Sequence, residues 1–147
     1  MFQDLGSSPA SMEAGKACDA FGSMPGYYVE QADAEQAYVQ APMKSKAVTW
    51  VALPRNRWPD EWAGMTRPVV ILQKALYGHP DNGTYWEQQC NAHCESVGFV
   101  PIPDWPSCYH MKRPDLFLTI YVDDSKLAGS KKHLAEGWRL IRGDATN

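Results

Sequence analysis

The sequence predicts a single α+β domain in which an antiparallel sheet has its helices packed on one face. Three observations lead to this prediction. The length of 147 residues corresponds to about one domain. The hydrophobic share of 44% and the charged share of 21% are those of an ordinary globular protein. Strand-like and helix-like segments alternate along the chain, and two strand-like segments are joined as tightly as in a β-hairpin.

Hydrophobic periodicity and turn residues place the elements in order along the chain. The first expected helix begins near Pro9 and ends before the glycine- and proline-containing stretch 22–26. The clearest helix spans residues 84–97, and an amphipathic helix over residues 131–141 closes the domain. The remaining elements are a short helix over residues 34–41 and strands over residues 27–32, 48–53, 69–73, 108–111, 116–122 and 125–129.

Composition and charge exclude several classes of protein. No apolar run approaches the roughly 18 residues needed to span a bilayer, and the N-terminus lacks the features of a secretory signal. We therefore expect an intracellular protein, cytoplasmic or nuclear, with no membrane partner and with its four cysteines as free thiols. The net charge of −3 argues against a general nucleic-acid coat protein. Residues 1–7 and 143–147 are expected to be tails, the first of them disordered.

Two adjacent aspartates, Asp123 and Asp124, lie at the tight connection after the apolar strand over residues 116–122. Aspartate is common in β-turns, so such a pair alone need have no function. A third carboxylate, Asp33, lies where another predicted strand gives way to a helix. Carboxylates that converge from separate segments are what a divalent-metal site for phosphoryl transfer requires. Mg²⁺ prefers oxygen ligands, and two ions can stabilise both the attacking and the leaving oxygen.

Four sequence blocks resemble those of one polymerase family. Residues 121–124, Tyr-Val-Asp-Asp, resemble the Tyr-x-Asp-Asp motif of reverse transcriptases. The blocks that resemble copia-type LTR retrotransposon polymerases are residues 30–40, Leu53-Pro54, and Leu-Tyr-Gly at residues 76–78 followed by Trp86. Blocks in this order and at about these distances are specific, and the resemblance covers the chain from about residue 8 to residue 141.

The resemblance implies the palm of an RNA-directed DNA polymerase, a nucleotidyltransferase, over residues 8–142. Asp33 and Asp123 match the principal metal ligands, and Asp124 completes an acidic triad for two Mg²⁺ ions, which Mn²⁺ can replace. Tyr38 matches the aromatic position beneath the sugar of the incoming deoxynucleotide. The implied partners are an RNA or DNA template-primer, a deoxynucleoside triphosphate and the remainder of a Pol polyprotein.

Two further residues are expected near the substrate by the same resemblance: Tyr121, in the motif itself, and Asp81. Asp81 stands where many family members have glutamine, and a carboxylate beside a triphosphate is electrostatically unfavourable. The family's fingers would precede residue 8 and its thumb would follow residue 141. We therefore expect a palm-containing fragment whose activity alone is weak at most, because catalysis in such sites depends on positioning.

A second interpretation of the sequence is a zinc-binding interaction module. Thiolates and imidazoles are good ligands of Zn²⁺, and the candidates are Cys90, His93, Cys94, Cys108 and His110. A helix over residues 84–97 places Cys90 and Cys94 on one face. Structural zinc sites more often use cysteine pairs in turns, which disfavours this interpretation.

A third interpretation is a non-catalytic remnant of a polymerase that keeps the fold. The loop over residues 55–62 carries Arg55, Arg57, Trp58 and Trp62, which could contact a nucleic-acid backbone and stack on bases. The alternative explanation of these residues is an ordinary exposed turn whose tryptophans pack on the core.

Overall fold

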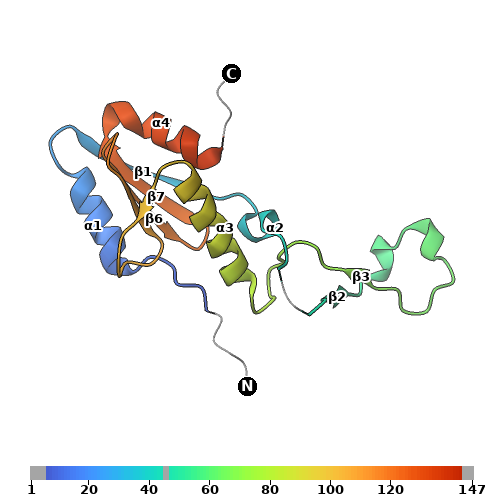
Figure 1. Ribbon diagram of the computed structural model, residues 1–147. Helices are drawn as coiled ribbons and strands as arrows, with labels where there is room; N and C mark the ends of the chain where they lie inside the picture. Colours follow the sequence, from blue (N-terminus) through green and yellow to red (C-terminus); the bar gives the residue numbers. More distant parts are fainter. Residues whose placement is uncertain (1–5, 45–46, 144–147) are drawn as a thin grey trace.

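The computed structural model describes residues 6–44 and 47–143, which form a five-stranded antiparallel sheet, its helices and a two-stranded arm (Figure 1). The order of strands in the sheet is β1-β7-β6-β5-β4. The α+β class and the antiparallel sheet are therefore confirmed. The strands are β1 (Tyr27–Asp33), β2 (Trp50–Val51), β3 (Val70–Ile71), β4 (Val100–Pro101), β5 (Cys108–Met111), β6 (Leu116–Tyr121) and β7 (Asp124–Ser130). The α-helices are α1 (Met12–Gly22), α2 (Ala37–Gln40), α3 (Asn82–Ser96) and α4 (Lys131–Arg142), and Arg55–Arg57 and Asp60–Trp62 form 3₁₀ turns.

Helices cover both faces of the sheet, whereas we expected them on one face only. The side chains of Leu116, Leu118 and Ile120 in β6 join a hydrophobic cluster with residues of α3 and α4. Phe117 of the same strand joins a second cluster with residues of α1, on the opposite face. Because apolar residues fill consecutive positions of β6, both faces of this strand must be covered. Figure 1 shows α1 on one side of the sheet and α3 and α4 on the other.

Strand β1 lies at the edge of the sheet and pairs with β7 over its whole length. The register runs from Tyr27 opposite Ser130 to Asp33 opposite Asp124. Strand β7 also forms the hairpin with β6, in which Tyr121 lies opposite Asp124. The end of β1 and the tip of the β6–β7 hairpin therefore lie side by side, although about 90 residues separate them along the chain.

The helix expected over residues 34–41 is reduced to the single turn α2. The backbone N–H of Ala34 donates to the carbonyl of Asp123 at 2.8 Å, which continues the pairing of β1 with the hairpin one residue beyond Asp33. Gln36 then adopts a left-handed conformation with φ of 52°. The pairing of β1 with the hairpin thus delays the helix to Ala37.

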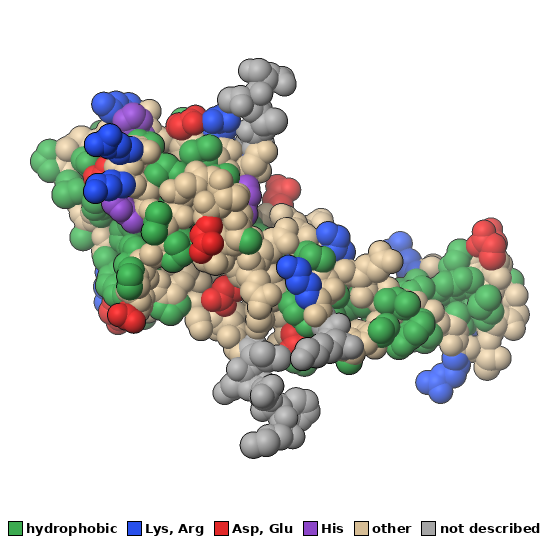
Figure 2. Space-filling model, in the orientation of Figure 1, with side chains coloured by type: hydrophobic (Ala, Val, Ile, Leu, Met, Phe, Trp, Pro, Cys, Tyr) green, Lys and Arg blue, Asp and Glu red, His purple; other side chains and the backbone are tan. Residues whose placement is uncertain are grey.

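The expected strands over residues 48–53 and 69–73 form only the short pair β2–β3, which extends as an arm away from the sheet (Figure 1). A two-stranded ribbon has no third strand against which to extend its pairing. Trp50 and Ile71 lie opposite each other, and both are exposed. Figure 2 shows hydrophobic side chains gathered over this arm. The exposed apolar residues of the β2–β3 ribbon are Val48, Trp50, Val69 and Ile71.

The two tryptophans of the 55–62 loop pack within the arm. The indole N–H of Trp58 donates to the carbonyl of Leu53 at 2.9 Å, and the ring of Trp58 meets that of Trp62 edge to face. Arg55 lies over the Trp58 ring at 5.6 Å from its centroid. The tryptophans are thus engaged locally, rather than on the core of the sheet.

The ends of the domain only partly fall within the described residues. Residues 1–5 and 144–147 of the expected tails lie outside them. Gly143 closes α4 in a left-handed conformation with φ of 72°, and so belongs to the helix end and not to a tail. None of the helices in the described ranges has the length and apolar character needed to cross a bilayer.

Candidate functional site

The candidate site is built on the two-residue connection between β6 and β7. Val122 and Asp123 make this connection, and Val122 adopts a φ of 59°. A β-branched residue rarely adopts a positive φ, and glycine usually occupies such a position in a hairpin turn. Strained backbone of this kind persists only where the surrounding structure holds it, and it concentrates at functional sites.

The structure brings the three predicted carboxylates to one end of the sheet. Asp33 and Asp124 are directly opposed across the β1–β7 pair, so their side chains leave the same face. The carbonyl of Asp123 accepts the Ala34 N–H at 2.8 Å, which joins the hairpin tip to the end of β1. Asp33 and Asp124 are exposed, and Asp123 is half-buried. This arrangement agrees with the predicted convergence of separate segments.

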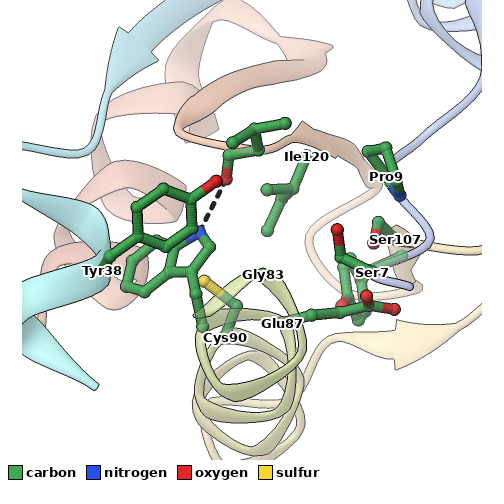
Figure 3. A pocket seen from close by; sticks show the side chains of 11 residues that line it. Ser7, Pro9, Tyr38, Gly83, Glu87, Cys90, Ser107 and Ile120 are labelled. Carbon is green, nitrogen blue, oxygen red and sulfur yellow. Dashed lines mark hydrogen bonds between the residues drawn. The ribbon is translucent and has the colours of Figure 1, made fainter. Parts of the chain in front are cut away.

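Trp86 of α3 supports the tip of the hairpin from the other side. Its indole N–H donates to the carbonyl of Val122 at 2.6 Å, and its ring is buried (Figure 3). A small cavity of about 20 Å³ lies beneath the tip and is lined in part by Tyr38, Trp86 and Val122. A space of that size accommodates about one water molecule. The strained conformation of Val122 is thus held by hydrogen bonds from both flanking segments.

Tyr38, expected beneath the sugar of a nucleotide, lies in α2 close to the hairpin tip. Its ring meets that of Tyr77 edge to face, with 4.6 Å between centroids. Burial raises the pKa of the Tyr38 hydroxyl, and the negative charge of Asp123 raises it further. The hydroxyl therefore stays protonated near neutral pH and can donate a hydrogen bond.

The other two expected substrate residues lie in different settings. Tyr121 lies opposite Asp124 in the hairpin and is 60% exposed, so it adjoins the carboxylates. Asp81 is the N-cap residue of α3, and its backbone N–H donates to Nδ1 of His79. Within the described residues, no hydrogen bond or ion pair joins Asp81 to the three carboxylates.

Asp33, Asp123 and Asp124 offer the type of ligand that a hard divalent cation prefers, but their side chains are not arranged as a metal site. Carboxylate oxygens are the ligands that Mg²⁺ prefers in proteins. Across residues 6–44 and 47–143, no three Asp, Glu, His or Cys side chains are placed so that they could hold one metal ion together. The backbone positions are adjacent, and the side chains would have to turn to face a single point.

A cavity of about 610 Å³ opens beside Asp33, between the end of β1 and the helices α3 and α4. Its lining includes Asp33 and Glu35 from one side and Arg142 from the other. The charged groups therefore border a space large enough for a small molecule, within the usual volume range of ligand pockets.

The structure contradicts the zinc interpretation. Cys94 belongs to the hydrophobic cluster beneath α3 and α4, whereas Cys108 belongs to the cluster on the α1 face of the sheet. Nε2 of His110 is engaged with Asp115 at 2.8 Å, and Nε2 of His93 lies 2.8 Å from the carbonyl of Ile141. Helical spacing brings Cys90 and Cys94 together, but the sheet separates this pair from Cys108.

Sequence reasoning missed the residues that hold the hairpin. The sequence marks Trp86 only as part of the block that begins with Leu-Tyr-Gly, because nothing in a sequence shows which carbonyl an indole N–H contacts. Ala34 acts through its backbone N–H, a group that every residue except proline has, so its residue type does not reveal this role. One feature of the sequence could have predicted the unusual φ of Val122. The connection between the two strands is very short, and only a few turn types, which include positive φ angles, fit such a connection.

Comparison with known proteins gives matches to yeast retrotransposon polyproteins. The chain is 26% identical over 119 residues to the Transposon Ty1-DR4 Gag-Pol polyprotein of Saccharomyces cerevisiae, which covers 78% of this chain and 7% of that protein. The Transposon Ty1-GR1 Gag-Pol polyprotein is 27% identical over 116 residues, covering 78% of this chain and 6% of that protein. The chain is thus similar to a short segment of these retrotransposon Gag-Pol polyproteins. No family model and no solved structure matches.

These matches support a retrotransposon-derived fragment. The chain spans about 7% of the length of the curated relatives that it matches.

Replacing Trp86 by phenylalanine tests whether its hydrogen bond holds the hairpin tip. The Trp86→Phe variant keeps a ring in the core but leaves the Val122 carbonyl without this donor. We expect a loss of about 1–3 kcal/mol in the free energy of unfolding, measured by urea denaturation. Trp105→Phe is the matched control, because Trp105 is 39% exposed. Equal stability of the two variants would show that the tip does not depend on this bond.

The thiols provide a second prediction. Burial raises the pKa of Cys90 and Cys94 to about 12 and that of Cys18 and Cys108 to about 11. Little reactive thiolate forms at pH 8, so a disulfide reagent should label the native protein far more slowly than the protein in urea. The folded state also holds these protons more tightly than the unfolded chain, so the free energy of unfolding should fall as the pH rises above about 9. Fast labelling of the native protein would contradict the burial of these groups.

Proposed function

We propose that this chain is the palm portion of a retrotransposon-derived RNA-directed DNA polymerase. The observation that carries the proposal is the β1–β7 register, in which Asp33 lies opposite Asp124 and the Asp123 carbonyl is bonded to Ala34. A turn aspartate without a function needs no partner from a strand about 90 residues earlier in the chain. The similarity to Gag-Pol polyproteins supports the same class of protein.

In this proposal Asp33, Asp123 and Asp124 hold divalent cations of the Mg²⁺ type, and Mn²⁺ can substitute. Such ions, when bound, stabilise the charge that develops in a phosphoryl transfer. The chain's own part is to present three carboxylates from a rigid sheet end, with Trp86 and Ala34 fixing the hairpin tip. Tyr38 and Tyr121 flank the carboxylates and offer ring faces and hydroxyls to a nucleotide and primer.

One observation favours a non-catalytic remnant as the second candidate. The carboxylates as placed do not converge on a single point, so the described residues contain no ready metal site. A chain that has kept the fold but lost the ability to turn these side chains together would show the same backbone. Activity therefore has to be measured directly.

Primer extension on an RNA template distinguishes these two candidates. With Mn²⁺ or Mg²⁺ and deoxynucleoside triphosphates, we expect weak templated incorporation that falls at least about tenfold in Asp123→Asn, because this change removes a ligand charge. Asp104→Asn is the matched control, since it makes the same change at an exposed loop residue whose φ of 62° suits asparagine. Equal incorporation by the protein and its Asp123→Asn variant would overturn the catalytic assignment. No incorporation by either the protein or the control would favour the remnant.

A further inference from the structure

A cluster of basic side chains lies at the end of the sheet opposite the carboxylates. It consists of Lys112 and Arg113, in the turn between β5 and β6, and Lys131, Lys132 and His133, at the start of α4. We call this cluster the basic end. Figure 2 shows Lys, Arg and His side chains gathered on this part of the surface.

The register of the sheet explains why two segments supply one cluster. Leu116, which follows the β5–β6 turn, lies opposite Gly129, which shortly precedes α4. A Cβ atom added at Gly129 would lie 2.7 Å from the carbonyl oxygen of Asp115, so the turn and the end of β7 are in close contact. The glycine at this position permits that close approach, and it brings Lys112 and Arg113 near the first turn of α4.

The cations of the basic end outnumber the carboxylates beside it, of which Asp115 is the nearest in the chain to Lys112 and Arg113. The carboxylate of Asp115 keeps its charge but points its oxygens at other groups, since His110 lies 2.8 Å from one oxygen and the Tyr27 hydroxyl donates to the other at 3.0 Å. Glu136 pairs with Arg139 within α4. Among residues 6–44 and 47–143, none of the ion pairs includes Lys112, Arg113 or Lys132. The first turn of α4 contains no acidic residue, so its positive helix end adds to these charges.

The separation from the carboxylates makes this a different surface. Along the β1–β7 pair, the basic end adjoins Tyr27 and Ser130, and the carboxylates lie at Asp33 and Asp124. Six residues of strand correspond to roughly 20 Å. Opposite charge therefore collects at the two ends of one rigid sheet, within a chain whose net charge is −3.

We propose that the basic end binds the phosphate backbone of a nucleic acid, independently of the carboxylate site. Its cations are exposed and extend from two separate elements, and none of the cavities described above includes them. The basic end lies at the ends of strands and not along an edge strand. It therefore has no row of free backbone N–H and C=O groups with which an extended peptide could pair. Recognition by charge alone suits a polyanion with regularly spaced phosphates. Lys131 lies over the Tyr28 ring, at 5.0 Å from the centroid, and keeps one cation fixed.

The test measures binding of a labelled 16-base-pair DNA duplex by fluorescence anisotropy at several salt concentrations. The variant Lys112→Gln/Arg113→Gln/Lys132→Gln removes three charges and leaves the Lys131–Tyr28 contact in place. We expect its Kd to rise at least about tenfold, and the slope of log K against log salt to become shallower by about 3. Thermal unfolding of each variant confirms that it is folded.

The matched control is Lys16→Gln/Lys44→Gln/Arg67→Gln, which removes two lysines and one arginine from exposed positions elsewhere. It should bind the duplex nearly as well as the unaltered chain. Equal weakening in both variants would overturn the proposal in favour of a general charge effect, as would tighter binding of poly-glutamate or of anionic vesicles than of the duplex. The Asp33→Asn variant should still bind the duplex. A result that overturns the polymerase proposal would therefore leave the basic-end proposal standing, and the reverse also holds.

Discussion

The pairing of β1 with β7 is the interaction on which the candidate site depends. Seven consecutive residue pairs fix β1 at the edge of the hairpin strand, and the last of them opposes Asp33 and Asp124. Because side chains alternate strictly along a strand, a slip of one residue would move Asp33 to the other face of the sheet. The Ala34–Asp123 hydrogen bond and the Phe21–Tyr27 ring contact anchor the two ends of this strand.

The hairpin tip concentrates features that are individually unfavourable. Three aspartates have neighbouring backbone positions, and Val122, between the apolar strand β6 and Asp123, adopts a positive φ. Hydrogen bonds from Trp86 and Ala34 to consecutive carbonyls hold this backbone in place. Strained backbone of this kind concentrates at functional sites, and the proposed cation site rests on this segment.

Much of the fold could be predicted where one periodic pattern was long and unambiguous. The helices α3 and α4 lie within two residues of their predicted bounds, because each packs its apolar residues against one hydrophobic cluster. Predictions failed where the decisive contact was distant. The pairing of β1 with β7 extends to Asp33 and Gln36 adopts a left-handed conformation, so α2 begins only at Ala37. The arm strands are short because they have no third strand.

The site could be predicted in part for the same reasons. The positions of Asp33, Asp123 and Asp124 were marked by residue type and by their place after strands. Their meeting required the β1–β7 register, which no local pattern specifies. The zinc interpretation failed because helical spacing relates Cys90 to Cys94 but says nothing of the sheet that lies between them and Cys108.

The most direct test of the central claim is the response of backbone amides to Mn²⁺ in the NMR spectrum of the isotopically labelled chain. Small amounts of this paramagnetic ion broaden the resonances of nearby nuclei. If the β1–β7 register creates one carboxylate site, the amides of residues 33–34 and 123–124 will broaden together, before any others. Broadening of one segment without the other, or broadening that follows surface acidity in general, would contradict the account.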